Sequence, residues 1–259
     1  MNHNSSLKDF FNISLILTRT QLKSRYRSTF AGAIWVIINP IILFLAHALI
    51  FKQIIKLDIP NYFIFLLASL IPWTFIVGNT NMVIPIFVTN REFLNSFNIN
   101  PLSLVVSMVM DNFLNFCISF VMVGLSIVLF LDTQLSISAL LLPIAILNLL
   151  SFIMGISILL STVHVFFRDT QYLINFINGL MYLLTPIFYP VEMVPSWARI
   201  FVEINPYYIM IRPFQLILNN FSNAPILLPF IISTLLGVGS LLIGHFFWKK
   251  MRNDIYAVL

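Results

Sequence analysis

Long runs of apolar residues follow one another along this chain, and charged residues stand almost only between them. The run 134–167 contains no Asp, Glu, Lys or Arg, and the run 170–191 contains none either. An uncharged apolar helix of about 20 residues crosses the hydrocarbon core of a bilayer, which is about 30 Å thick. Because an isolated strand cannot satisfy its backbone in lipid, these runs predict membrane-spanning helices.

The pattern predicts six spans and one preceding helix. The spans cover residues 30–51, 62–88, 101–131, 135–167, 170–189 and 225–248, and prolines interrupt the second. Residues 1–29 are too polar and too long for a cleavable signal peptide. Within them, residues 7–26 form an amphipathic pattern that is typical of a helix lying on the membrane surface. The sequence therefore predicts an all-α polytopic membrane protein, with a cytoplasmic interface helix in 1–29 and a transmembrane domain in 30–259.

Composition and charge agree with this class and give it an orientation. The chain is 59% hydrophobic and 9% charged, whereas a soluble domain carries about 25% charged residues. With the N-terminus inside, most of the 14 basic residues fall on the cytoplasmic side, and only Lys52, Lys56, Arg199 and Arg212 fall outside. Basic residues beside spans favour the cytoplasm, so both termini are expected to be cytoplasmic.

The segment VFFRDT, residues 165–170, places an Arg–Asp pair between two uncharged runs. With both termini inside, it is a short cytoplasmic turn. Arg168 anchors the turn on the cytoplasmic side, and Asp169 can cap the following helix. This structural role is sufficient by itself, and an added functional role stays open.

The cytoplasmic loop 89–101 has the features of a short exposed helix. Thr89 and Glu92 have the spacing of a capping box, and Pro101 limits the other end. Phe93 and Phe97 recur at helical spacing beside Arg91. The loop is either a connector whose apolar face rests on the membrane or a plug for a partner's groove.

The external segment 190–220 is rich in proline and aromatic residues. Its apolar positions recur at helical spacing, and they include Trp197, Phe201, Tyr207 and Tyr208. The pattern predicts one or two short interfacial or re-entrant helices at an exit mouth. An ordinary loop resting on the membrane with an aromatic belt is the alternative.

Candidate chemistry is sparse. The chain has no phosphate-binding loop, no metal-binding or hydrolase motif, and a single cysteine, Cys117. Asp111 is the best intramembrane candidate for an ion relay, but it could equally pair with a polar neighbour for structure alone. We therefore expect a passive conduit without a cofactor, moved by something else.

Three segments resemble type-2 ABC exporter permeases, in the branch that exports O-antigen, capsule and teichoic-acid polymers. The first is residues 22–42, in which a basic-aromatic run precedes Gly32, Trp35, Asn39 and Pro40. The second is residues 154–190, with Phe-Arg-Asp followed by an aromatic span that ends in Thr-Pro-Ile-x-Tyr, and the third is NPYYIMIRPFQ, residues 205–215. The order of elements agrees over nearly the whole chain, although His164 departs from the small or polar residue expected there.

The resemblance implies a homodimer in the bacterial inner membrane, docked to two copies of a separate ATPase subunit that holds ATP and Mg. It implies a lipid-linked polysaccharide as substrate and no nucleic-acid partner. The loop 89–101 would be the coupling helix and 190–220 the gate. The residues expected to couple to the ATPase are Arg91, Glu92, Phe93, Phe97, Arg168 and Asp169.

The polymer path and the carrier site are expected from side-chain chemistry. Aromatic rings stack on the apolar faces of sugars, so Trp35, Phe51, Tyr172, Phe176 and Tyr182 are candidate path residues, with lipid or helix packing as the alternative. Arg25 and Arg27 suit the pyrophosphate of the lipid carrier, but they could also be positive-inside anchors.

Two other functions remain open. One is a permease of the same type for teichoic acid or small lipophilic compounds. The other is a membrane-embedded lipid-modifying enzyme, which should carry several polar catalytic residues at the interface.

Overall fold

The computed structural model describes residues 7–27, 34–97, 99–131, 137–218 and 226–258, and this part of the chain is helical without strands. Four of its helices are long and apolar enough to cross a membrane. They are α3 (Tyr62–Val83), α6 (Leu102–Leu131), α7 (Leu142–Phe166) and α11 (Leu227–Val258). The prediction of an all-helical polytopic membrane protein is confirmed. Six spans stay a prediction, because α2 (Ile34–Leu49) and α8 (Thr170–Leu184) are shorter.

Helix boundaries differ from the predicted ones where proline or charge intervenes. α8 ends at Leu184 rather than near Tyr189, and Thr185 is extended, with φ −87° and ψ 131°. Pro186 is the physical reason, because the residue before a proline is disfavoured in the α conformation. α2 continues into the π-helix η1 (Ile50–Ile54). The 3₁₀ helix η2 (Ile137–Leu141) precedes α7. α11 continues beyond the predicted end at Trp248 and ends at Val258.

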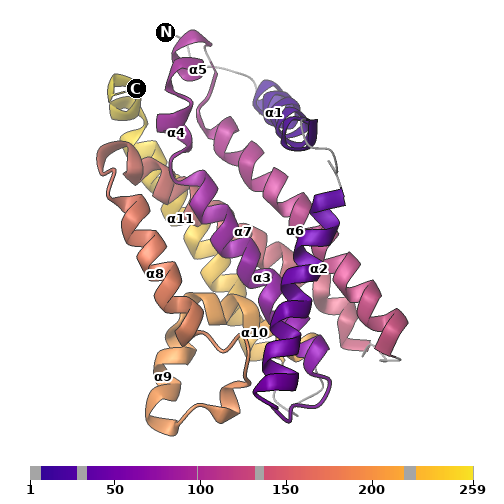
Figure 1. Cartoon of the computed structure of the whole chain (residues 1–259). Helices are drawn as coiled ribbons and strands as arrows, with labels where there is room; N and C mark the ends of the chain where they lie inside the picture. Colours follow the sequence, from indigo (N-terminus) through magenta and orange to yellow (C-terminus); the bar gives the residue numbers. More distant parts are fainter. Residues whose placement is uncertain (1–6, 28–33, 98, 132–136, 219–225, 259) are drawn as a thin grey trace.

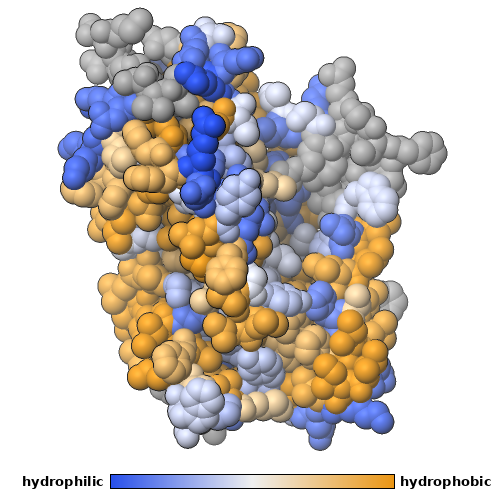
Figure 2. Space-filling view, turned by 60° about the vertical axis from the view of Figure 1, so that its left-hand side comes forward, coloured by the Kyte–Doolittle hydropathy of each residue, from blue (hydrophilic) through white to orange (hydrophobic). Residues whose placement is uncertain are grey.

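The helix α1 (Leu7–Arg27) and the C-terminal end of α11 lie at the same end of the bundle (upper end of Figure 1). The short helices α4 (Ile86–Thr89) and α5 (Arg91–Ser96) and the turn between α7 and α8 lie there as well. At the opposite end lie η1 and α9 (Ser196–Ile204), while α10 (Pro206–Leu218) lies just above α9. Figure 2 shows hydrophobic side chains across the middle of one face and hydrophilic ones gathered mainly at its upper end. This distribution is that of a bundle immersed in a membrane.

α3 is the central helix of the bundle. It contacts α2, α6, α7, α8 and α10. In its most apolar stretch of 18 residues, 78% of the residues are buried. The remaining open stripe runs along one side, through Thr74, Val77, Gly78, Asn81 and Met82. This side of the otherwise buried helix carries polar and small residues.

α7 and α11 pack through small residues. A side-chain carbon at Gly155 would lie 2.2 Å from the carbonyl carbon of Ser240, and one at Gly244 would lie 2.4 Å from the carbonyl oxygen of Gly155. The Asn148 amide donates hydrogen bonds to the hydroxyls of Ser233 (3.1 Å) and Thr234 (2.8 Å). Small residues that let helix backbones approach and polar residues that bond across them are the usual means of packing in lipid.

The first helix, α1 (Leu7–Arg27), packs on α6 through its small polar residues. Ser14 and Thr18 are buried, and the Thr18 hydroxyl reaches the carbonyl of Ser107 at 3.4 Å. The large apolar residues Phe11 and Ile16 are exposed. The apolar face of α1 is therefore available to a membrane, and its role as an interface helix stays a prediction.

Candidate functional site

The pair α4–α5 forms a projection anchored in the core. Phe87 of α4 is fully buried, and its ring lies 5.7 Å from the ring of Trp248 on α11. Asn90, which joins the two helices, donates its side-chain amide to the carbonyl of Ile86 at 2.8 Å. Because α4 is held by the core, α5 has a fixed position at this end of the bundle.

α5 presents charged and aromatic side chains outward. Arg91 and Glu92 are exposed, Phe93 is half-buried against the core, and Phe97 is 56% exposed. The rings of Phe93 and Phe97 lie 5.0 Å apart. The structure thus brings together the four residues predicted to couple on this helix, and their coupling role stays a prediction.

The capping-box interpretation of this segment is wrong. Thr89 ends α4, and its hydroxyl donates to the carbonyl of Pro85 at 3.0 Å. Asn90 occupies the N-cap position of α5 and makes no side-chain cap hydrogen bond. The Thr89 hydroxyl, which the capping box would need, is already hydrogen-bonded within the preceding turn of helix.

The turn between α7 and α8 exposes both charged residues. Arg168 and Asp169 are exposed, and neither side chain bonds to another described residue. Asp169 holds the N-cap position, but the first turn is closed instead by Thr170, whose hydroxyl donates to the carbonyl of Phe167 at 2.6 Å. The position predicted for Asp169 is confirmed, while the side-chain cap bond is absent.

The five predicted path residues fall into two groups. Trp35, Tyr172 and Phe176 are exposed on α2 and α8. Phe51 and Tyr182 instead join an aromatic cluster around Phe188, with ring distances of 4.3 and 5.3 Å. Phe51 and Tyr182 are half-buried, so the first group is the more accessible one in this conformation.

Histidine completes this aromatic cluster. The ring nitrogen Nδ1 of His47 donates to the carbonyl of Leu43 at 2.7 Å, and its Nε2 forms a hydrogen bond with the Tyr182 hydroxyl, 2.8 Å away. The His47 ring also stacks on Phe188 at 5.2 Å. The cluster joins α2 to α8 near the lower end of Figure 1.

The predicted gate residues also divide. Trp197 and Phe201 are strongly exposed on α9, whereas Tyr208 of α10 is buried. Burial raises the pKa of Tyr208 to about 12, and nearby Arg212 opposes that rise. The Tyr208 hydroxyl is therefore neutral at physiological pH, and Tyr208 packs in a small buried cluster with Val191 and with Val202 of α9.

Arg212 ties this region together. Its guanidinium lies 3.6 Å from a carboxylate oxygen of Glu192, in the 3₁₀ helix η3 (Val191–Met193). It also lies 5.9 Å from the centre of the Tyr208 ring.

Amide side chains hold α10 against α8 and α3. Asn205 donates to the hydroxyl of Thr185 at 2.8 Å. Gln215 donates both to the hydroxyl of Ser69 and to the carbonyl of Pro186, each at 2.9 Å. The segment just after α8 is therefore fixed to the core.

A second set of amides lies inside the bundle, near the middle of α3. Asn112 of α6 donates to Asn79 of α3 at 3.2 Å, and Asn79 donates to Ser157 of α7 at 2.7 Å. On the other side of α3, the Tyr207 hydroxyl donates to Asn178 at 2.8 Å. Asn178 in turn donates to the hydroxyl of Thr80 on α3 at 3.3 Å. These bonds connect α6, α7 and α8 directly to α3, and α10 through α8.

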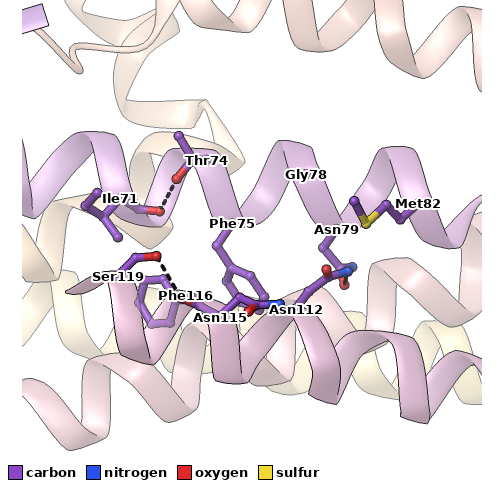
Figure 3. Close-up of a pocket in the computed structure, with 10 residues that line it drawn as sticks. All are labelled: Ile71, Thr74, Phe75, Gly78, Asn79, Met82, Asn112, Asn115, Phe116 and Ser119. Carbon is purple, nitrogen blue, oxygen red and sulfur yellow. Dashed lines mark hydrogen bonds between the residues drawn. The ribbon is translucent and has the colours of Figure 1, made fainter. Parts of the chain in front are cut away.

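A cavity of about 140 Å³ opens between α3 and α6 beside this network. Figure 3 shows Thr74 and Asn79 on one wall and Asn112 and Ser119 on the other. Sequence reasoning missed this site, although uncharged amides at helical spacing in an apolar span would have signalled it.

The remaining predicted residues are placed only in part. The backbones of Arg25 and Arg27 belong to the last turn of α1, but their side chains lie outside the described part of the chain. Asp111 is fully buried in α6.

Comparisons with known proteins extend over most of the chain. The sequence profile of the family described as ABC-2 type transporter matches residues 14–219. An O-antigen export system permease protein RfbA of Klebsiella pneumoniae is 30% identical over 198 residues, which is 76% of either chain. A protein of the same description from Myxococcus xanthus is 25% identical over 217 residues, or 82% of either chain.

Proposed function

Because this chain belongs to the ABC-2 type transporter family, we propose that it is the transmembrane permease of an exporter of lipid-linked polysaccharide. The substrate class is the one in the name of its relatives, which are O-antigen export permeases. In this proposal ATP hydrolysis takes place on a separate subunit, which agrees with the lack of a phosphate-binding loop in this sequence.

One observation carries the proposal. The core-anchored α5 and the exposed turn at the base of α8 lie at the same end of the bundle. From that end α8 runs toward the opposite one, and the segment after it is tied to Asn205, just before α10, and to Gln215 of α10. A force delivered by a partner at one end is thereby connected to the segment at the other end.

Assembly and location are part of the same proposal. Two copies form a dimer in the bacterial inner membrane, each with six spans, and two ATPase subunits dock on the cytoplasmic end. α2 and α8 supply the two shorter spans. α2 is lengthened by the π-helix η1, and α8 is followed by the extended residue Thr185. The exposed rings of Trp35, Tyr172 and Phe176 are available for the partner copy or for the polymer.

The lipid carrier is proposed to bind beside the last turn of α1. Arg25 and Arg27 stand there on the chain, at the same end of the bundle as α5. Arginine binds phosphate oxygens through two parallel N–H groups, which suits a pyrophosphate at the membrane surface.

The function is tested by reconstitution. The permease and its ATPase subunit are reconstituted in vesicles so that the ATPase lies on the outside. The lipid-linked polysaccharide is placed in the outer leaflet, on the same side as the ATPase. Addition of ATP should move the polymer into the vesicle interior, where a glycosidase added outside cannot cleave it. Transport of small lipophilic compounds without polymer movement would support the first competing function. Chemical change of the lipid without ATP would support the second.

Asp169→Ala is expected to leave the complex assembled and to lower both export and polymer-stimulated ATP hydrolysis. Its carboxylate makes no cap hydrogen bond, so its loss removes only a charge–dipole interaction of about 0.3–1 kcal/mol. Purified yield and export per molecule are measured together, with Asp169→Asn as the variant of equal size. A lower yield with normal export per molecule would mean that Asp169 only stabilises the helix.

A further inference from the structure

The open stripe of α3 places small and polar residues beside the apolar Val77 and Met82. Thr74, Gly78 and Asn81 lie on it, in a helix whose other faces are buried. Polar side chains at membrane depth usually face a bundle interior or a water-filled space, because lipid cannot satisfy them. Asn81 accepts a hydrogen bond from Asn178 of α8 at 3.4 Å, which leaves Thr74 as the polar residue of the stripe that is open to water or to a polar ligand.

The cavity between α3 and α6 continues this stripe inward. The Thr74 hydroxyl donates to the carbonyl of Ile71, and the Ser119 hydroxyl donates to that of Asn115, each at 2.8 Å. Both donors are thus used within their own helices (dashed lines in Figure 3). A hydroxyl oxygen has two acceptor lone pairs, and these remain for a donor in the cavity.

Aromatic rings complete the lining. Phe75 and Phe116 line the cavity and stack on each other at 5.0 Å. The cavity has about 140 Å³, close to the roughly 150 Å³ of an engineered cavity that admits benzene. Its size is therefore that of one six-membered ring.

We infer that this cavity is a sugar-binding site, which holds one ring of the polymer through hydroxyl donors to Thr74 and Ser119 and through contact with Phe116. No charged residue is among the residues that line it, which favours a neutral polyhydroxyl ligand over a phosphate. The inference rests on the proposed function and adds α3 and α6 to the path. Such a site makes few bonds per sugar, so the polymer can move on.

Gly78 allows the site to be blocked without disturbing the fold. A side-chain carbon at Gly78 would meet nothing within 4 Å, and the residue lines the cavity. Gly78→Leu should fill the cavity and reduce polymer export at least about tenfold, because adding bulk to an occupied site is strongly unfavourable. Gly78→Ala should have a smaller effect in the same direction.

Two other glycines provide matched controls. Gly179 on α8 and Gly239 on α11 also have nothing within 4 Å of an added carbon, and neither lines this cavity. Gly239→Leu should export at nearly the wild-type rate. Equal export by Gly78→Leu and Gly239→Leu would overturn the inference. If Gly179→Leu were the one variant of the three to lose export, the sugar contacts would lie on α8 instead.

A labelling experiment tests the ligand directly. Ser119→Cys is made together with Cys117→Ala, which removes the native thiol from the same helix. A membrane-impermeant maleimide should label the new thiol, and purified lipid-linked polysaccharide should slow the labelling severalfold. Labelling only by a lipid-soluble reagent, or no protection by the polymer, would contradict a sugar site.

The two levels of proposal fail differently. If the wild-type complex exports polysaccharide and Gly78→Leu exports it equally well, the site is wrong and the function stands. If the wild-type complex moves no polysaccharide at all, the proposed function is wrong and the sugar site falls with it.

Discussion

Gly155→Ala is expected to remove most of the folded protein from the membrane. The new side-chain carbon would lie 2.2 Å from the carbonyl carbon of Ser240 and 2.4 Å from the backbone nitrogen of Leu241. Backbone atoms cannot rotate away as a side chain can, so α7 and α11 must separate. Overpacking a tight core typically costs 1–3 kcal/mol, and here the loss extends to the bonds across the same helix pair, such as the 3.3 Å bond from Ser240 to the carbonyl of Phe152.

The measurement is the amount of monodisperse protein extracted in detergent and its melting temperature. Gly244→Ala should behave in the same way, since its carbon would lie 2.4 Å from the Gly155 carbonyl oxygen. Gly78→Ala and Gly239→Ala are the controls, with nothing within 4 Å and about 1 kcal/mol better helix propensity. If all four variants melt alike, the close crossing of α7 and α11 is incorrect.

Phe97→Ala is expected to weaken the binding of the ATPase subunit about thirtyfold. Phe97 follows the last residue of α5, in extended conformation, and 56% of it is exposed. An aromatic residue at the centre of an interface commonly contributes about 2 kcal/mol or more, which corresponds to a change of about thirtyfold in Kd. The measurement is the affinity between the purified permease and the ATPase, supported by co-purification from membranes.

Phe97 is a cleaner test than Phe93, which is half-buried against the core. Phe93→Ala would mix a loss of docking with a loss of stability. Phe201→Ala is the matched control, because Phe201 is 71% exposed at the opposite end of the bundle. If Phe97→Ala binds the ATPase as tightly as Phe201→Ala does, then α5 is not the docking helix.

The sequence predicted those parts of the fold that depend on runs of apolar residues. α3, α6, α7 and α11 are found where uncharged stretches predicted spans, and the exposed turn at Arg168 and Asp169 is where two such stretches meet. These features follow from the length and the hydrophobicity of segments that are continuous in the sequence. Their boundaries were less accurate, as at Leu184, where one proline shortens α8.

The sequence did not predict the contacts between segments distant along the chain. The Asn112–Asn79–Ser157 bonds connect three helices, and no periodicity within one helix shows which amides meet. For the same reason, Phe51 and Tyr182 were expected in a path, although they pack around Phe188. In a chain with 26 Phe, ring position alone cannot separate packing from binding.

The attachment of the segment after α8 has a mechanical consequence. Gln215 and Asn205 hold Pro186 and Thr185, whereas the other end of α8 begins at an exposed turn. A helix fixed at one end swings like a lever about that end. Over the 15 residues of α8, a tilt of about 10° moves the free end by about 4 Å and the fixed end hardly at all. A push at the turn would therefore displace the start of α8 by several ångströms while Thr185 and Pro186 stay in place.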